Sequence, residues 1–170
     1  LDGFYYKPRT DWDLLERHSE GLMATSGCLG GLVCQLLQNN DRSGAEKAVE
    51  RFQSVFGRDS FFVELQDHGL PEDHLVNPQL IEIAKRLDAP LLATNDSHYT
   101  HKHDAEAHDA LLCVQTGSTM DDPKRFKFDA EEFYLKSAQE MRDLFSDNPE
   151  ACDNTLLVAE RAQVEIEFDQ

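Results

Sequence analysis

The sequence has few of the patterns that identify secreted, membrane or nucleotide-binding proteins. Its four cysteines form no C-x-x-C pair and its first residues lack the layout of a targeting peptide, so a cytoplasmic protein without a disulfide scaffold or zinc ribbon is expected. No apolar run approaches the roughly 20 residues that span a bilayer, so no membrane partner is expected. A P-loop, a G-x-S-x-G elbow and a dinucleotide glycine fingerprint are also absent, which excludes the most common nucleotide-binding and hydrolase classes.

Positive charge is scarce as well. Sixteen basic residues against 33 acidic ones give a net charge of −17 over 170 residues. Such a chain repels a phosphate backbone unless basic groups cluster or divalent metal ions bind. We therefore do not expect it to bind duplex DNA by itself. Its length and its 40% hydrophobic residues are those of one domain with a core.

Three short apolar runs predict strands, at residues 22–25, 61–65 and 91–94. Helical spacing of apolar residues separates them, most clearly over residues 43–56 and up to residue 87. Strands that alternate with helices indicate a parallel α/β fold, in which ligands bind beyond the carboxyl ends of the strands. Further helices are expected over residues 104–114 and from about residues 137 and 148, and alternation predicts a last strand at residues 164–168.

Polar side chains follow each predicted strand. Asp96 and His98 come after the third, two residues apart, so on an extended strand end both point to one side, as ligands of a shared metal would. A D-x-H spacing arises by chance about once in a chain of this composition, so an ordinary loop with a helix-capping histidine remains an alternative. Cys28 lies in the glycine-rich turn after the first strand, where it either meets this pair as a thiolate or fills space as a small packing residue.

Glu64 and His68 lie at the end of the middle strand, so three neighbouring strand ends offer ligand-type side chains. They either bind metal or bond to the backbone and adjacent loops. His101, like His103 and His108, is expected to be solvated or to support the ligands from outside. Two basic and aromatic segments, residues 4–9 and 124–128, either stack on nucleic-acid bases or dock on another domain, and docking is the expectation.

Six segments, in order, carry a resemblance to a known family: GFYYKPR, TSGCLGG, FVELQDHG, ATNDSHY, DALLCVQTG and PEACDNT. They resemble the PHP (polymerase and histidinol phosphatase) domain of bacterial DNA polymerase III alpha subunits of the DnaE type, with most similarity to actinobacterial members. The resemblance implies an α/β fold, with residues 1–150 as the C-terminal part of a distorted (β/α)7 TIM-like barrel. Residues 151–170 would be a helix and strand leading toward the polymerase palm. The lack of a starting methionine agrees with an internal fragment.

The resemblance also implies a metal-dependent function. Family members with a complete ligand set hold a metal cluster at the strand ends and hydrolyse a DNA 3′ end as a 3′-5′ proofreading exonuclease. By motif, Cys28, Asp96 and His98 match the last three ligands, whereas Glu64 and His68 match a strand end without ligands. The earlier ligands, beginning with an H-x-H pair, would precede Leu1. The fragment alone is therefore expected to be inactive and to bind zinc, manganese or magnesium weakly or not at all.

The complete protein would be a DNA-directed DNA polymerase. Its expected partners are the 3′ end of DNA, the polymerase palm and thumb domains, and replisome subunits such as the sliding clamp. One alternative is a non-catalytic PHP scaffold that stabilises the polymerase and docks partners. Another is a free-standing phosphatase of the histidinol-phosphate type, which shares the D-x-H motif but not the polymerase-like segments.

Overall fold

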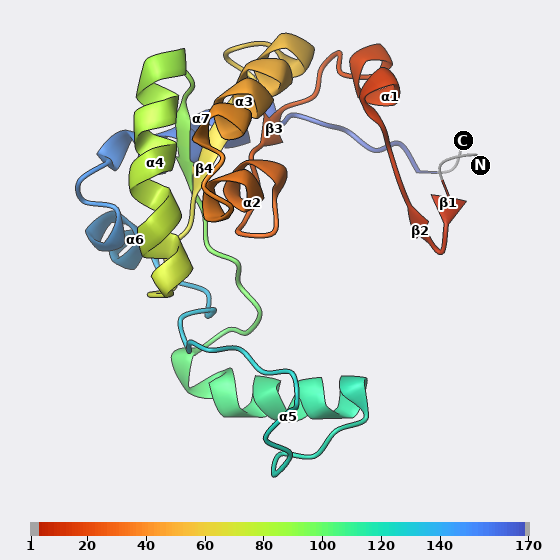
Figure 1. Ribbon diagram of the computed structural model, residues 1–170, viewed down its shortest axis with the longest axis vertical. Coiled ribbons are helices and arrows are strands. Elements are labelled where there is room, and N and C mark those ends of the chain that lie inside the picture. Colours follow the sequence, from red (N-terminus) through yellow and green to blue (C-terminus); the bar gives the residue numbers. More distant parts are fainter. Residues whose placement is uncertain (1–3, 169–170) are drawn as a thin grey trace.

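The computed structural model describes residues 4–168, and these form a mixed α/β body around a small parallel sheet (Figure 1). The strand order is β3 (Ala24–Thr25), β4 (Phe61–Leu65) and β5 (Leu91–Ala93). Both pairings are parallel, with Ala24 opposite Phe61 and Val63 opposite Leu91. The three strands predicted from the sequence are confirmed, although the first and third are shorter than their apolar runs.

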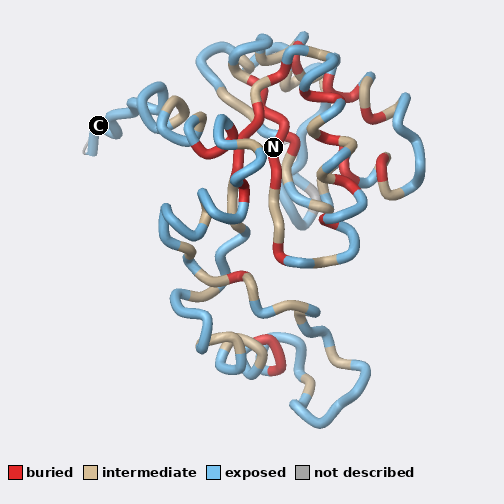
Figure 2. The backbone as a smooth tube through the Cα atoms, turned by 90° about the vertical axis from the view of Figure 1, so that its left-hand side faces the viewer, coloured by how far each residue is buried: buried red, intermediate tan, exposed pale blue. Residues whose placement is uncertain are grey.

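The core lies between the sheet and the helices beside it. All five residues of β4 are buried, because a central parallel strand is covered on both faces. Helices α2 (Leu32–Gln38), α3 (Arg42–Phe56) and α4 (Pro71–Leu87) pack together, and α7 (Pro149–Arg161) packs against β5. Figure 2 shows that the buried residues gather in this body.

Local sequence fixes where α3 begins and ends. The Asp41 carboxylate accepts the Gly44 N–H at 2.8 Å and so caps the first turn. Ala45, Ala48 and Val49 are buried, as their three-and-four spacing predicts. Gly57 then takes a φ of +92°, a conformation that strains other residues, and ends the helix.

A second part of the chain lies apart from the body and is joined to it by two segments (Figure 1). It holds the 3₁₀ turn η1 (Lys102–Asp104), helix α5 (Ala105–Thr116) and an irregular loop over residues 117–135. A bridge between Tyr99 and Tyr134 links the two connecting segments. Figure 2 shows little burial here, and α5 itself buries only Leu112 and Cys113.

The remaining elements are short. Helix α1 (Trp12–Arg17) packs on α3, with the rings of Trp12 and Phe52 4.8 Å apart. Helix α6 (Ala138–Leu144) precedes α7. Strands β1 (Phe4–Tyr5) and β2 (Lys7–Pro8) form an antiparallel hairpin that the sequence did not predict.

The strand predicted at residues 164–168 is not formed. The described residues offer no neighbouring strand with which it could pair, and alternation alone does not make a strand. The sheet as described has three parallel strands and is open. In the part of the chain that the structure describes, no helix is both long and apolar enough to cross a membrane.

Candidate metal centre

The structure brings Asp96 and His98 together in the loop that leaves β5. The His98 Nδ1 atom lies 2.8 Å from the backbone carbonyl oxygen of Asp96 and 3.7 Å from its Oδ1 atom. A carbonyl can only accept, so this contact favours the neutral tautomer with the proton on Nδ1, in which Nε2 carries the lone pair. This backbone contact is the kind that orients metal-binding histidines. The pair is partly exposed, so a ligand can reach it.

A returning segment holds this loop in place. The Phe133 carbonyl accepts the His98 N–H at 2.8 Å, and the Tyr99 carbonyl accepts the Leu135 N–H at 3.0 Å. The His98 ring also meets the edges of aromatic rings, at centroid distances of 4.7 Å to Phe128 and 5.8 Å to Phe133. The backbone hydrogen bond and the ring contacts together fix the position of the His98 imidazole.

Cys28 follows β3, in the turn that leads to α2, and so also lies beyond the carboxyl end of a strand of the parallel sheet. That turn requires glycine, because a Cβ on Gly31 would lie 2.4 Å from the Ser26 carbonyl oxygen. Cys28 is exposed and lines a cavity of about 10 Å³ together with Cys34 and Glu64. Such a cavity holds no more than one water molecule. Burial, reinforced by Cys28 and Glu64, raises the pKa of Cys34 to about 11, so this second thiol stays protonated.

Glu64 connects the ends of β4 and β5. It is almost fully buried, and its carboxylate accepts hydrogen bonds from the Thr94 hydroxyl and, at 3.0 Å, from the Gln66 amide. Its contacts are thus those of a buried carboxylate bonded to neighbouring loops.

His68 is 4% exposed and stacks on Phe133, with ring centroids 4.2 Å apart. Its backbone N–H donates to the Asp73 carboxylate at 2.8 Å, and its ring Nδ1 lies 3.8 Å from the same oxygen. Its Nε2 has no hydrogen-bond partner among the described residues. Burial lowers the pKa of His68, which keeps the ring neutral.

His101 is exposed and directly precedes the turn η1. Its ring stacks on that of His103, with centroids 5.2 Å apart, and its backbone N–H donates to the Asp104 carboxylate at 2.8 Å. His108 is half-buried instead, and its ring lies 5.5 Å from that of His98. Burial, and then the nearby His98, lower the pKa of His108.

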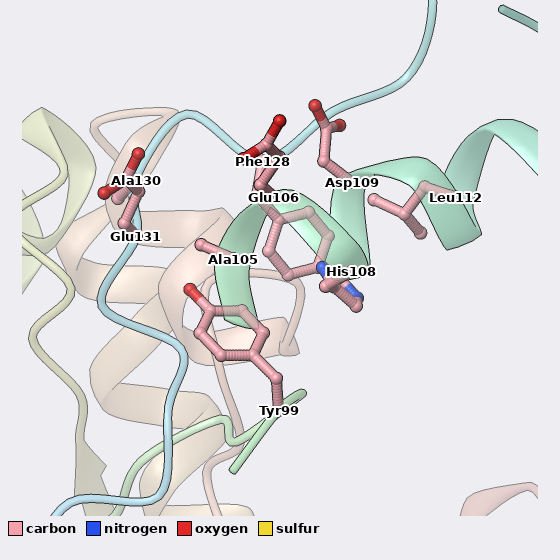
Figure 3. A pocket seen from close by; sticks show the side chains of 9 residues that line it. All are labelled: Tyr99, Ala105, Glu106, His108, Asp109, Leu112, Phe128, Ala130 and Glu131. Carbon is pink, nitrogen blue, oxygen red and sulfur yellow. The ribbon is translucent and has the colours of Figure 1, made fainter. Parts of the chain in front are cut away.

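A cavity of about 300 Å³ adjoins the rings of His108 and Phe128, which contact His98 (Figure 3). Tyr99, His108 and Phe128 line it, together with the carboxylates of Glu106 and Glu131. Figure 3 shows Glu131 on the returning segment, across from the side chains on α5. Because Phe128 and His108 also contact His98, the cavity and the D-x-H loop share part of their walls.

The donor atoms fit a metal site in chemistry and only in part in arrangement. A thiolate, a carboxylate and an imidazole are all metal ligands, and the lone pair on His98 Nε2 is available. Between residues 4 and 168, however, the structure contains no group of three or more His, Cys, Asp or Glu side chains arranged to hold an ion. Asp96 and His98 thus lie together, whereas Cys28 lines a separate small cavity with Glu64.

Several residues that build the loop had no signal in the sequence. Phe133, Tyr134 and Lys136 hold the D-x-H loop although they are more than 30 residues away along the chain. They reach His98 and Asn95 because the chain returns from the α5 part to the end of β5. The basic and aromatic segment noted in the sequence, residues 124–128, ends before them.

Comparison with known proteins gives the family. The PHP domain family matches residues 1–68. The chain is 46% identical over 161 residues to a protein of Borreliella burgdorferi, and 46% identical over 166 residues to one of Treponema pallidum. It is 47% identical over 156 residues to one of Mycobacterium tuberculosis, an actinobacterium. Each relative is named DNA polymerase III subunit alpha.

These alignments cover 95%, 98% and 91% of this chain, but only 14%, 14% and 13% of the respective relatives. The chain thus corresponds to a small part of a much longer protein in each case. The similarity extends well beyond the 68 residues of the domain match and includes the D-x-H loop. The chain therefore belongs to the bacterial DNA polymerase III alpha subunit family and carries part of a PHP domain.

Proposed function

We propose that the chain supplies one side of a metal-dependent phosphoesterase site with 3′-5′ proofreading exonuclease activity, within a replicative DNA-directed DNA polymerase. The observation that carries this proposal is the geometry of Asp96 and His98. They lie together beyond the carboxyl end of β5, where parallel α/β folds bind ligands, and the Asp96 carbonyl favours the His98 tautomer whose lone pair is on Nε2. Residues 1–150 would be the C-terminal part of a distorted (β/α)7 barrel, and residues 151–170 would lead toward the palm.

In this proposal Asp96, His98 and Cys28 are metal ligands, and the remaining ligands come from other parts of the polypeptide. The bound zinc, manganese or magnesium ions would activate water and stabilise the oxygens of the cleaved phosphodiester. The chain's own task is to hold the donors. The Asp96 carbonyl fixes the His98 tautomer, and the Phe133 carbonyl fixes the position of the His98 backbone.

The proposed partners follow from the family and the charge. The site would act on the 3′ end of DNA in the cytoplasm, next to the palm and thumb domains and to replisome subunits such as the sliding clamp. With a net charge of −17 the chain repels DNA, so divalent cations at the strand ends would have to offset that repulsion locally.

The test is the substitution Asp96→Asn in the full-length polymerase. It keeps the shape of the side chain and removes the charge of a proposed ligand. We expect mismatch removal to be abolished and nucleotide addition to be largely retained, whereas Asp121→Asn, at an exposed loop position, should leave both unchanged. Undiminished removal of a mismatched 3′ nucleotide by the Asp96→Asn protein contradicts the proposal.

A second function is favoured by a specific observation. Residues 4–168 contain no assembled group of three metal-ligating side chains, and Cys28 and Glu64 share their own small cavity. These facts support a PHP domain that serves as a non-catalytic scaffold, stabilising the polymerase and docking partners. Metal analysis of the full-length protein discriminates the two functions. A scaffold retains its fold and its polymerase activity with no metal that depends on Asp96.

A further inference from the structure

Lys136 has a side chain that is only 5% exposed. Burial lowers its pKa, and the carboxylate of Glu132 acts in the opposite direction. Lysines are seldom buried, because an ammonium group loses its hydration and must be bonded by the protein instead. The partners of this ammonium therefore indicate what its burial achieves.

Those partners belong to two segments that are far apart in the sequence. From its own segment, Lys136 donates to the backbone carbonyl of Glu132, lies 3.5 Å from the Glu132 carboxylate and lies 4.3 Å from the centre of the Tyr134 ring. From the loop after β5, it reaches the Asn95 Oδ1 atom at 3.4 Å. The buried cation thus links the returning segment to the loop that leaves the sheet.

Asn95 is held at both ends of its amide. Its Oδ1 accepts from Lys136, while its Nδ2 donates to the Tyr134 carbonyl at 2.6 Å and to the Ser97 hydroxyl at 3.3 Å. Asp96 follows directly in the chain, and His98 lies two residues further on. Fixing the amide of Asn95 therefore fixes the direction in which the backbone carries the D-x-H pair.

Neutralising Glu132 does not require Lys136. Lys102, whose side chain is 57% exposed, also binds the Glu132 carboxylate and makes no contact with Asn95 that the structure records. The two lysines share the Glu132 carboxylate as an acceptor, but Lys136 is the more buried of the two and also contacts the Glu132 carbonyl and Asn95. The Asn95 contact separates a positioning role from simple charge neutralisation, because Lys102 can neutralise Glu132 without it.

We propose that Lys136 is a positioning residue for the Asp96 and His98 pair, acting through the amide of Asn95. The proposal deepens the proposed function and rests on it for the purpose of the positioning, but the contact itself is independent of any metal. Removing the ammonium frees one end of the Asn95 amide. The loop then samples orientations in which Asp96 and His98 no longer face a common ion.

The experiment compares Lys136→Met with Lys102→Met in the full-length polypeptide. Methionine keeps most of the buried volume and removes the charge. The first measurement is hydrogen exchange of the amides of residues 96–99, with those of β4 as the measure of global folding. We expect faster exchange at residues 96–99 in Lys136→Met alone, with β4 unchanged in both variants.

The second measurement is Mn²⁺ binding by electron paramagnetic resonance, with the Asp96→Asn protein as the blank for ions bound elsewhere. Partners that orient metal ligands typically change affinity about 10- to 100-fold, and we expect a loss of that order in Lys136→Met. Asn95→Ala should give at least as large a loss, because it also removes the contacts with Tyr134 and Ser97. Adding Lys136→Met to it should cost little more, since Asn95→Ala already removes the contact that the two residues share. Lys102→Met should bind as the unmodified protein does.

The outcomes are distinct. Unchanged exchange at residues 96–99 in Lys136→Met overturns the positioning role, whatever the metal result. Equal Mn²⁺ losses in Lys136→Met and Lys102→Met, or fully additive losses with Asn95→Ala, overturn it as well. If exchange accelerates as expected but Asp96→Asn removes no bound Mn²⁺, the clamp on the loop stands and the proposed metal function fails.

Discussion

Phe133 joins the α5 part to the α/β body through its ring contacts, so its removal should weaken that connection. The side chain is 8% exposed, and its ring meets His68 at 4.2 Å, Phe128 at 4.6 Å and His98 at 5.8 Å. Phe→Ala substitutions in cores cost about 3 to 5 kcal/mol, and an aromatic pair contributes about 0.5 to 1.5 kcal/mol of such a loss. If the substitution lowers the free energy of detaching this segment from the body by about 3 kcal/mol, the population of the detached state rises roughly 150-fold.

Tryptic cleavage after Lys136 measures this opening, because the buried lysine can enter a protease only when the segment detaches. Under conditions where closing is faster than cleavage, the rate follows the open population. We expect Phe133→Ala to be cut at least about tenfold faster at this bond, and Phe133→Leu to lie between it and the unmodified protein.

Phe126→Ala is the matched control, since Phe126 belongs to the same loop but is 57% exposed. It should change the rate little, as exposed positions usually change stability by less than about 0.5 kcal/mol. Equal cleavage rates after Lys136 in Phe133→Ala and Phe126→Ala refute the reasoning that Phe133 holds the two parts together.

Two further predictions concern titration and the loop over residues 117–135. Burial lowers the pKa of His68 in the folded protein below its ordinary value of 6.5. As the pH falls below 6.5, the unfolded chain therefore takes up a proton before the folded one does. The free energy of unfolding that is present above pH 6.5 is then lost toward the lower folded pKa, at up to about 1.4 kcal/mol per pH unit. Urea unfolding followed by the fluorescence of Trp12 should show a weaker pH dependence in His68→Phe; an identical slope would argue against it. Arg125 binds the Asp109 carboxylate through both terminal nitrogens and lowers the pKa of that group. Arg125→Met should therefore release the loop and speed tryptic cleavage after Lys127, and an unchanged rate would show that the ion pair does not hold it.

The sequence by itself determined the elements of the body and the nature of the family. The three-and-four spacing of apolar residues predicted α3 over residues 43–56, and a short apolar run predicted β4. The structure starts α3 one residue earlier, where Asp41 caps it. Six ordered segments, including those around Cys28 and Asp96, resembled a PHP-type polymerase sequence, and the relatives confirm this. These features are local, so they can be read along the chain.

The candidate site was predictable only in part. The spacing of Asp96 and His98 at a strand end predicted that they lie together, and they do. Their meeting with Cys28 stays a prediction, because it depends on residues at three strand ends and on ligands from elsewhere in the protein. His68 and Glu64 have ligand chemistry, but in the structure they are bonded to Asp73 and Thr94 in the buried space beneath the loops.

Only the tertiary structure decided how the D-x-H loop is held. Asn95 meets Tyr134 and Lys136 because the chain leaves β5, forms α5 and returns, which brings together residues about 40 positions apart. Contacts of this kind depend on loop closure and on burial, and no periodicity in the sequence encodes them. The same reason explains why residues 164–168 alternate as a strand does and yet form none: a strand needs a partner, and a partner is a property of the fold.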